Sequence, residues 1–162
     1  MNDPHLHLIL NHLPIITPLI GFIIMIGGLL ISSEIVKRTA YLIFIMAALA
    51  AITAFATGEG AEAVIENLGG IDEDLIKRHE EIAETFAIFC YVLGGISVLG
   101  LWANFYKKSF SDKIPYLTIL ICAMTLYFAK QTATSGGEIR HSEIRESKKI
   151  EPARSEFIEI ND

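Results

Sequence analysis

Four long stretches of the chain are almost free of charged residues. Residues 13–31, 39–57 and 85–106 contain no Asp, Glu, Lys or Arg, and residues 114–135 contain Lys130 alone. A helix of about 20 apolar residues crosses a hydrocarbon layer roughly 30 Å thick. The pattern therefore predicts four transmembrane helices over these ranges.

The connections between the predicted spans divide into two short ones and one long one. Residues 32–38 and 107–113 form short connections, so successive helices are expected to run in opposite directions. The sequence thus predicts an all-α fold, a polytopic membrane protein built as an antiparallel bundle of four transmembrane helices, in residues 1–137. Residues 138–162 are strongly charged and are expected to form a separate tail.

The long connection, residues 58–84, is acidic and is expected to be largely helical. The second helix should continue beyond the hydrocarbon boundary until Leu68, which two glycines follow. Asp72 and the two acids after it are typical of a helix start, and that helix should run through His79 into the third span. Residues 1–12 are interpreted as a short polar segment leading into the first span.

Composition narrows the class of protein. The chain is 52% hydrophobic and 20% charged, with a mean hydropathy of +0.46. This composition, arranged in four spans, excludes a soluble globular enzyme, a nucleic-acid-binding module and a disulfide-stapled secreted domain. The chain contains no phosphate-binding loop, nucleophile–base pair or nucleotide fingerprint, so we expect binding rather than enzymatic turnover.

The distribution of charge predicts the orientation in the membrane. The net charge is −6, yet the two short connections are basic. One carries Lys37 and Arg38, and the other carries Lys107, Lys108 and Lys113. Short loops rich in Lys and Arg stay in the cytoplasm. The chain is therefore expected to be a multi-pass protein of the cell inner (cytoplasmic) membrane, with both termini on the periplasmic side.

The two cysteines are not expected to form a disulfide. Cys90 lies near the outer end of the third span and Cys122 lies near the middle of the fourth. At about 1.5 Å per helical residue their depths differ by more than about 10 Å, which is too far for a disulfide. They are interpreted as small buried apolar residues.

In the predicted topology the outer ends of all four helices meet at one membrane face, and candidate metal ligands lie at each of them. Glu138 and His141 are spaced i, i+3, which places both side chains on one face if the helix continues. Imidazole and carboxylate groups suit zinc, iron or copper. The predicted metal ligands are His12, Glu62, His79, Glu138 and His141.

A haem variant uses two of the same residues. The first and third helices of an up-and-down bundle lie diagonally, so His12 and His79 are candidates to ligate a haem b iron from opposite sides. No C-x-x-C-H motif is present, which excludes covalent haem attachment. The alternative is a polar outer rim that binds no ligand.

Several of these residues lie in segments that resemble a bacterial family. They are the histidine and proline of the first helix, Thr57 to Glu62, His79, and the segment Gly136-Gly137-Glu138-Ile139-Arg140-His141. The chain is similar here to a domain-of-unknown-function family of four-helix predicted inner-membrane proteins. The resemblance spans residues 5–141 and implies a four-helix membrane domain that sometimes accompanies c-type cytochrome modules. It also implies that the five candidate ligands occupy motif positions.

Two functions remain open on the sequence. The first is a periplasmic-facing protein that binds a transition metal or haem b in a redox or electron-transfer role. The second is a structural or accessory subunit of a respiratory-type membrane complex with no cofactor of its own, since glycines in spans are a usual helix-packing device. The expected partners are the lipid bilayer, c-type cytochrome or respiratory-complex subunits, and a second copy of the chain, but no nucleic acid.

Overall fold

The computed structural model describes residues 3–68 and 72–145, apart from the side chains of a few residues within these ranges. The described part is helical and contains no strand. Its elements are α1 (Asp3–Leu10), α2 (Leu13–Leu30), α3 (Glu34–Leu68), α4 (Glu73–Phe105), α5 (Ile114–Arg140) and a short 3-10 turn, η1 (Ser142–Ile144).

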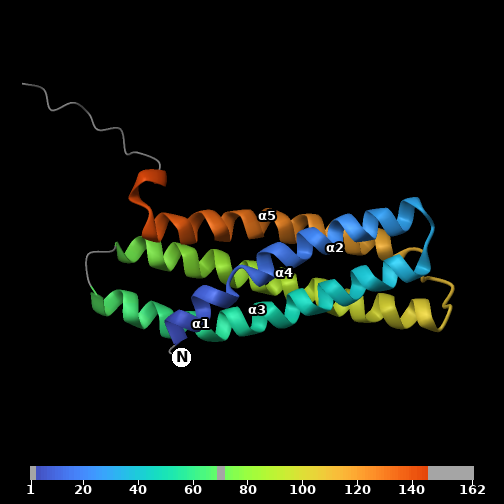
Figure 1. The fold of residues 1–162 in the computed structure, drawn as a ribbon, viewed down its shortest axis with the longest axis horizontal. Coiled ribbons are helices and arrows are strands. Elements are labelled where there is room, and N and C mark those ends of the chain that lie inside the picture. The colour runs from blue at the N-terminus through green and yellow to red at the C-terminus, as the bar shows by residue number, and fades with distance from the viewer. Residues whose placement is uncertain (1–2, 69–71, 146–162) are drawn as a thin grey trace, which may run out of the picture.

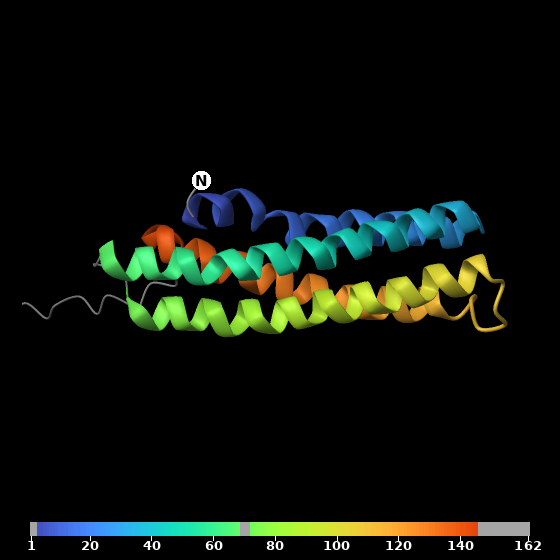
Figure 2. The same ribbon diagram turned by 90° about the horizontal axis from the view of Figure 1, so that it is seen from below.

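The four long helices lie side by side along the long axis of the molecule (Figures 1 and 2). The turn between α2 and α3 and the loop between α4 and α5 lie at the same end, which we call the basic end because it carries Lys37, Arg38, Lys107 and Lys108. At the opposite end are α1, the start of α4 and the end of α5 (Figure 1). We call this the histidine end.

The predicted spans correspond closely to the observed helices. Four helical stretches of the described part are long and apolar enough to cross a membrane. They are His5–Leu30, Glu34–Val64, Glu73–Phe105 and Ile114–Arg140. The extensions of the second and third helices beyond the apolar spans are confirmed, because α3 ends at Leu68 and the carboxylate of Asp72 accepts a hydrogen bond from the backbone N–H of Asp74 at 3.1 Å. Residues 69–71 lie outside the described residues.

The interpretation of residues 1–12 as a simple lead-in is wrong. Residues Asp3–Leu10 form the separate helix α1, which packs against α3. Pro4 lies in its first turn, where the missing N–H of proline costs no helical hydrogen bond. The chain then breaks at Asn11 and His12 before α2 begins at Leu13. Beyond this break α1 continues from α2 toward the histidine end (Figures 1 and 2).

Glycines allow the long helices to approach closely. A Cβ atom built on Gly21 of α2 would lie 2.5 Å from the ring of Phe44, and one on Gly94 of α4 would lie 2.5 Å from the Cβ of Ala48. Phe44 and its neighbour Tyr41 are fully buried in the core of the bundle. Small residues have the same effect in membrane proteins, where they let neighbouring helix backbones approach closely.

The outer surface of the bundle is apolar. Ile23 is 63% exposed, Leu30 80% and Leu120 59%. A soluble protein rarely exposes apolar residues so continuously, and a lipid environment removes the cost. Both cysteines are free and buried, as predicted. The described residues form an all-helical fold whose four long helices could each cross a membrane by length and composition.

Candidate functional site

His79 is held between α4 and α5 at the histidine end. Its Nδ1 atom lies 2.9 Å from the hydroxyl of Ser135, and that hydroxyl donates to the carbonyl of Thr132 at 3.2 Å. When the Ser135 hydroxyl donates its one proton to that carbonyl, Nδ1 of His79 donates to the hydroxyl and Nε2 carries the lone pair. The ring lies against the backbone of α5, because a Cβ on Gly136 would be 3.0 Å from its Cε1.

His7 on α1 is held against α3 in the same way. Its Nδ1 lies 2.9 Å from the carbonyl oxygen of Ala54 and 3.3 Å from the hydroxyl of Thr57. A carbonyl oxygen only accepts hydrogen bonds, so Nδ1 carries the proton and Nε2 carries the lone pair. The break after α1 is what places this ring on the bundle.

His7 and His79 lie close enough to interact electrostatically. We call them the histidine pair. Both are half-buried. Two buried polar atoms at the same end have no hydrogen-bond partner, namely Oγ1 of Thr132, whose residue is only 9% exposed, and Oδ1 of Asn11. Thr132 lies one turn before Ser135 on α5. This end of the bundle therefore has polar groups that its own side chains do not fully satisfy.

Glu138 is engaged in an ion pair. One of its carboxylate oxygens lies 3.4 Å from a terminal nitrogen of Arg78, and the Glu138 side chain is 12% exposed. Arg78 precedes His79 on α4, so α4 and α5 bring Glu138 and His79 to the same end of the interface between them. The carboxylate is nevertheless directed to the arginine.

The predicted shared helical face of Glu138 and His141 is wrong. Helix α5 ends at Arg140, and His141 has an extended backbone with φ −116° and ψ 92°. Arg145 explains where the helix ends, because its guanidinium donates to the carbonyl oxygens of Glu138 at 2.7 Å and Ile139 at 3.2 Å. Nδ1 of His141 instead lies 2.9 Å from the carboxylate of Glu143. The Glu143 backbone N–H and His141 lower the pKa of that exposed carboxyl.

The two other predicted ligands are His12 and Glu62. His12 is exposed at the start of α2 and makes no capping hydrogen bond. Glu62 is half-buried on α3. Among the residues that the structure describes, no three His, Cys, Asp or Glu side chains are close enough to hold a metal ion. The five predicted ligands thus do not form one cluster within residues 3–68 and 72–145.

The residue that the sequence analysis missed is His7. Asp3 and Pro4 are typical of a helix start, so the sequence held a signal that His7 lies on a helix. Nothing in the pattern indicated that this helix would pack against α3.

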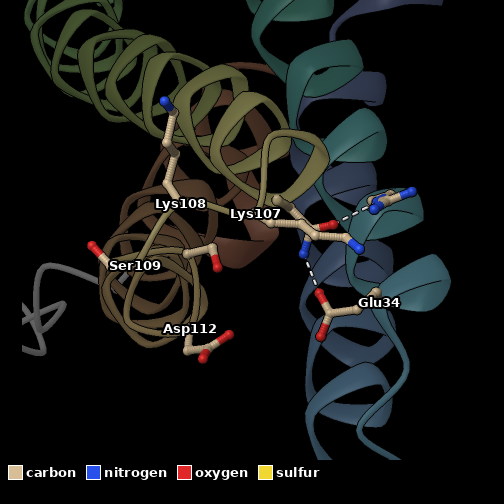
Figure 3. A pocket seen from close by; sticks show the side chains of 8 residues that line it. Glu34, Lys107, Lys108, Ser109 and Asp112 are labelled. Atoms are coloured by element: carbon tan, nitrogen blue, oxygen red, sulfur yellow. Dashed lines mark hydrogen bonds between the residues drawn. The ribbon is translucent and has the colours of Figure 1, made fainter.

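The basic end holds a second polar cluster that the sequence did not reveal. Asn104 of α4 is 7% exposed and links two residues of α3: its amide oxygen accepts from Nε of Arg38, and its amide nitrogen donates to the carboxylate of Glu34. Lys37 forms an ion pair with the same carboxylate. Figure 3 shows Glu34 with the two hydrogen bonds of this cluster as dashed lines.

This cluster forms one wall of a pocket of about 430 Å³. The other walls come from the loop between α4 and α5, with Lys107, Lys108, Ser109 and Asp112 (Figure 3). A second hollow, of about 460 Å³, lies on α5 and is lined by apolar side chains such as Leu120 and Met124. Neither hollow is lined by a histidine, so neither offers a porphyrin an imidazole ligand.

Comparisons with known proteins identify no relative of this chain. No family model matches it, and no curated protein or solved structure is significantly similar to it. The functional argument therefore rests on the side chains at the two ends of the bundle.

Proposed function

We propose that this chain is a membrane protein that binds a transition-metal ion at its histidine end, with Nε2 of His7 and Nε2 of His79 as protein ligands. One observation supports this more than any other: Nδ1 of each ring is hydrogen-bonded to a protein oxygen, the Ala54 carbonyl for His7 and the Ser135 hydroxyl for His79. Histidines that bind metals almost always donate their other ring N–H in this manner, which orients the ring and fixes the tautomer.

The surroundings of the pair favour a bound ion with further ligands from water. Two imidazoles leave coordination positions open, and the unpartnered hydroxyl of Thr132 is available to hold a metal-bound water. Imidazole suits zinc, copper and iron alike, and a redox role follows only for copper or iron. Glu138 enters this proposal as the partner of Arg78 rather than as a ligand.

The proposal includes an orientation. The four long helices cross the inner membrane as an antiparallel bundle, with the histidine end on the periplasmic side and the basic end in the cytoplasm. The positive-inside rule supports this arrangement, since Lys37, Arg38, Lys107 and Lys108 lie at one end.

The test is metal binding to the full-length protein purified in detergent. Equilibrium dialysis against Zn²⁺ and Cu²⁺, followed by elemental analysis, measures the affinity and the stoichiometry. His7→Ala and His79→Ala should each weaken binding at least about 10–100-fold, because losing a ligand costs no less than losing an outer hydrogen-bond partner. Binding should also be lost in acid, since a protonated imidazole has no lone pair for the metal.

His12→Ala is the matched control, because it removes an exposed imidazole near the same end. The proposal expects that variant to bind metal like the original protein. Equal losses in all three variants would instead favour nonspecific chelation, and unchanged binding in His79→Ala would rule out the histidine pair. A Soret band in the purified protein, lost in His79→Ala, would point to haem b in place of a metal ion.

A second candidate function, an accessory subunit of a larger membrane complex, is favoured by two glycines. A Cβ built on Gly27 of α2 or on Gly95 of α4 would meet nothing within 4 Å. Small residues facing lipid allow another helix to approach closely. Replacing both with leucine should then dissociate a complex seen on native gels of gently solubilised membranes, whereas a wild type that migrates as a monomer would count against this candidate.

A further inference from the structure

The pocket at the basic end carries an excess of positive charge. Its carboxylate Glu34 is already engaged by Lys37 and Asn104, so its charge is compensated within the bundle. The other charged groups of the pocket are three cations, Arg38, Lys107 and Lys108, and one anion, Asp112. In the part of the chain that the structure describes, none of these three cations forms an ion pair with a carboxylate.

Two of the three cations lie against aromatic rings. The guanidinium of Arg38 stacks 4.1 Å from the ring centroid of Phe105, and the ammonium of Lys108 lies 5.1 Å from that of Trp102. Arg38 uses Nε for Asn104, so its two terminal nitrogens remain available as donors. A guanidinium with two free terminal N–H groups matches the geometry of phosphate oxygens.

The pocket lies at the depth where lipid headgroups are expected. Exposed aromatic residues surround it: Trp102 is 45% exposed, Phe105 57% and Tyr106 68%. Tryptophan and tyrosine are enriched at the boundary between hydrocarbon and water, at the level of the headgroups. Exposed apolar side chains such as Ile35 continue from this level along the bundle.

We propose that this pocket binds the phosphate group of an anionic membrane phospholipid. Arg38 and Lys107 bind the phosphate oxygens, and the hydroxyl of Ser109 at the pocket wall offers a further donor. Lys108, whose ammonium is directed away from the other two cations toward Trp102, adds positive charge at the rim (Figure 3). The acyl chains lie along the apolar outer surface of the helices. The site is at the opposite end of the molecule from the histidine pair and does not depend on it.

The experiment measures lipid binding to the full-length protein. Native mass spectrometry of the detergent-purified protein, titrated with phosphatidylglycerol or phosphatidylcholine, gives the affinity for each lipid. The original protein should prefer phosphatidylglycerol. The double variant Lys107→Gln/Lys108→Gln should lose about 30-fold in that affinity, because each basic side chain near an anionic surface contributes a factor of about five.

The matched control is Lys77→Gln/Arg140→Gln, which removes two exposed charges at the histidine end. It should bind phosphatidylglycerol as the original protein does. Equal losses in the two double variants would overturn the proposal, because the effect would then be one of net charge alone. Competition by glycerol phosphate at the same concentration as the lipid would also overturn it, since the ligand would then be a soluble phosphate compound.

Discussion

Asn104 shows how much a single buried polar residue contributes to this bundle. It is buried, and it joins α4 to Arg38 and Glu34 of α3. Buried polar groups in a membrane protein are costly unless they are hydrogen-bonded, and here each member of the cluster satisfies another. The sequence showed an ordinary Asn beside an aromatic residue, and only the tertiary contact reveals its role.

We predict that Asn104→Ala destabilises the protein by about 1–3 kcal/mol. The substitution removes the hydrogen bonds of Asn104 to Arg38 and to Glu34, which keeps only Lys37, and hydrogen bonds to charged groups contribute about that much. Thermal unfolding of the detergent-purified protein measures the effect. Gln131→Ala is the control, since it removes an exposed amide that bonds only to the Tyr127 hydroxyl. Similar thermal unfolding midpoints for the two variants would contradict a stabilising role for the hydrogen bonds of Asn104.

At the scale of elements, helix boundaries were predictable where local chemistry decides them. Asp72 begins α4 because its carboxylate accepts from Asp74, and this depends only on residues next to each other in sequence. The end of α5 was not predictable, because Arg145 reaches back to the carbonyls of Glu138 and Ile139. The predicted Glu138–His141 face failed for this reason.

Two adjacent glycines of α4 should respond differently to the same substitution. Gly94→Ala places a methyl group 2.5 Å from the Cβ of Ala48 and forces α3 and α4 apart. Crowding of this kind typically costs about 1–3 kcal/mol. Gly95→Ala meets open space and should be neutral or slightly stabilising, because alanine is the better helix former. Unfolding of the two variants in one detergent provides the comparison, and equal stabilities would contradict the close contact of α3 and α4.

At the scale of the whole molecule, the two ends of the bundle differ in chemistry. The histidine end carries His7, His79 and Glu138, and the basic end carries Arg38 and Lys107 (Figure 1). Nothing in the packing of the helices against one another requires this separation. A membrane with different surroundings on its two faces provides a physical reason for it.

The orientation leads to a labelling prediction. Glu80→Cys places a thiol at the histidine end and Ser109→Cys places one at the basic end, while both native cysteines are buried. In intact spheroplasts a membrane-impermeant maleimide should label Glu80→Cys at once and Ser109→Cys only after permeabilisation. The reverse pattern would invert the proposed orientation, and labelling of both variants before permeabilisation would contradict a protein that spans the membrane between these two sites.

The sequence alone determined the four apolar helices, because about 20 apolar residues in succession have few alternatives to a helix in lipid. It also determined the start of α4, which depends on neighbouring residues. The tertiary structure alone decided that His7 bonds to α3, that Asn104 joins α3 to α4, and that His141 leaves the helix. Each of these depends on groups brought together from distant positions, and a one-dimensional pattern of apolar and polar residues does not record which faces meet.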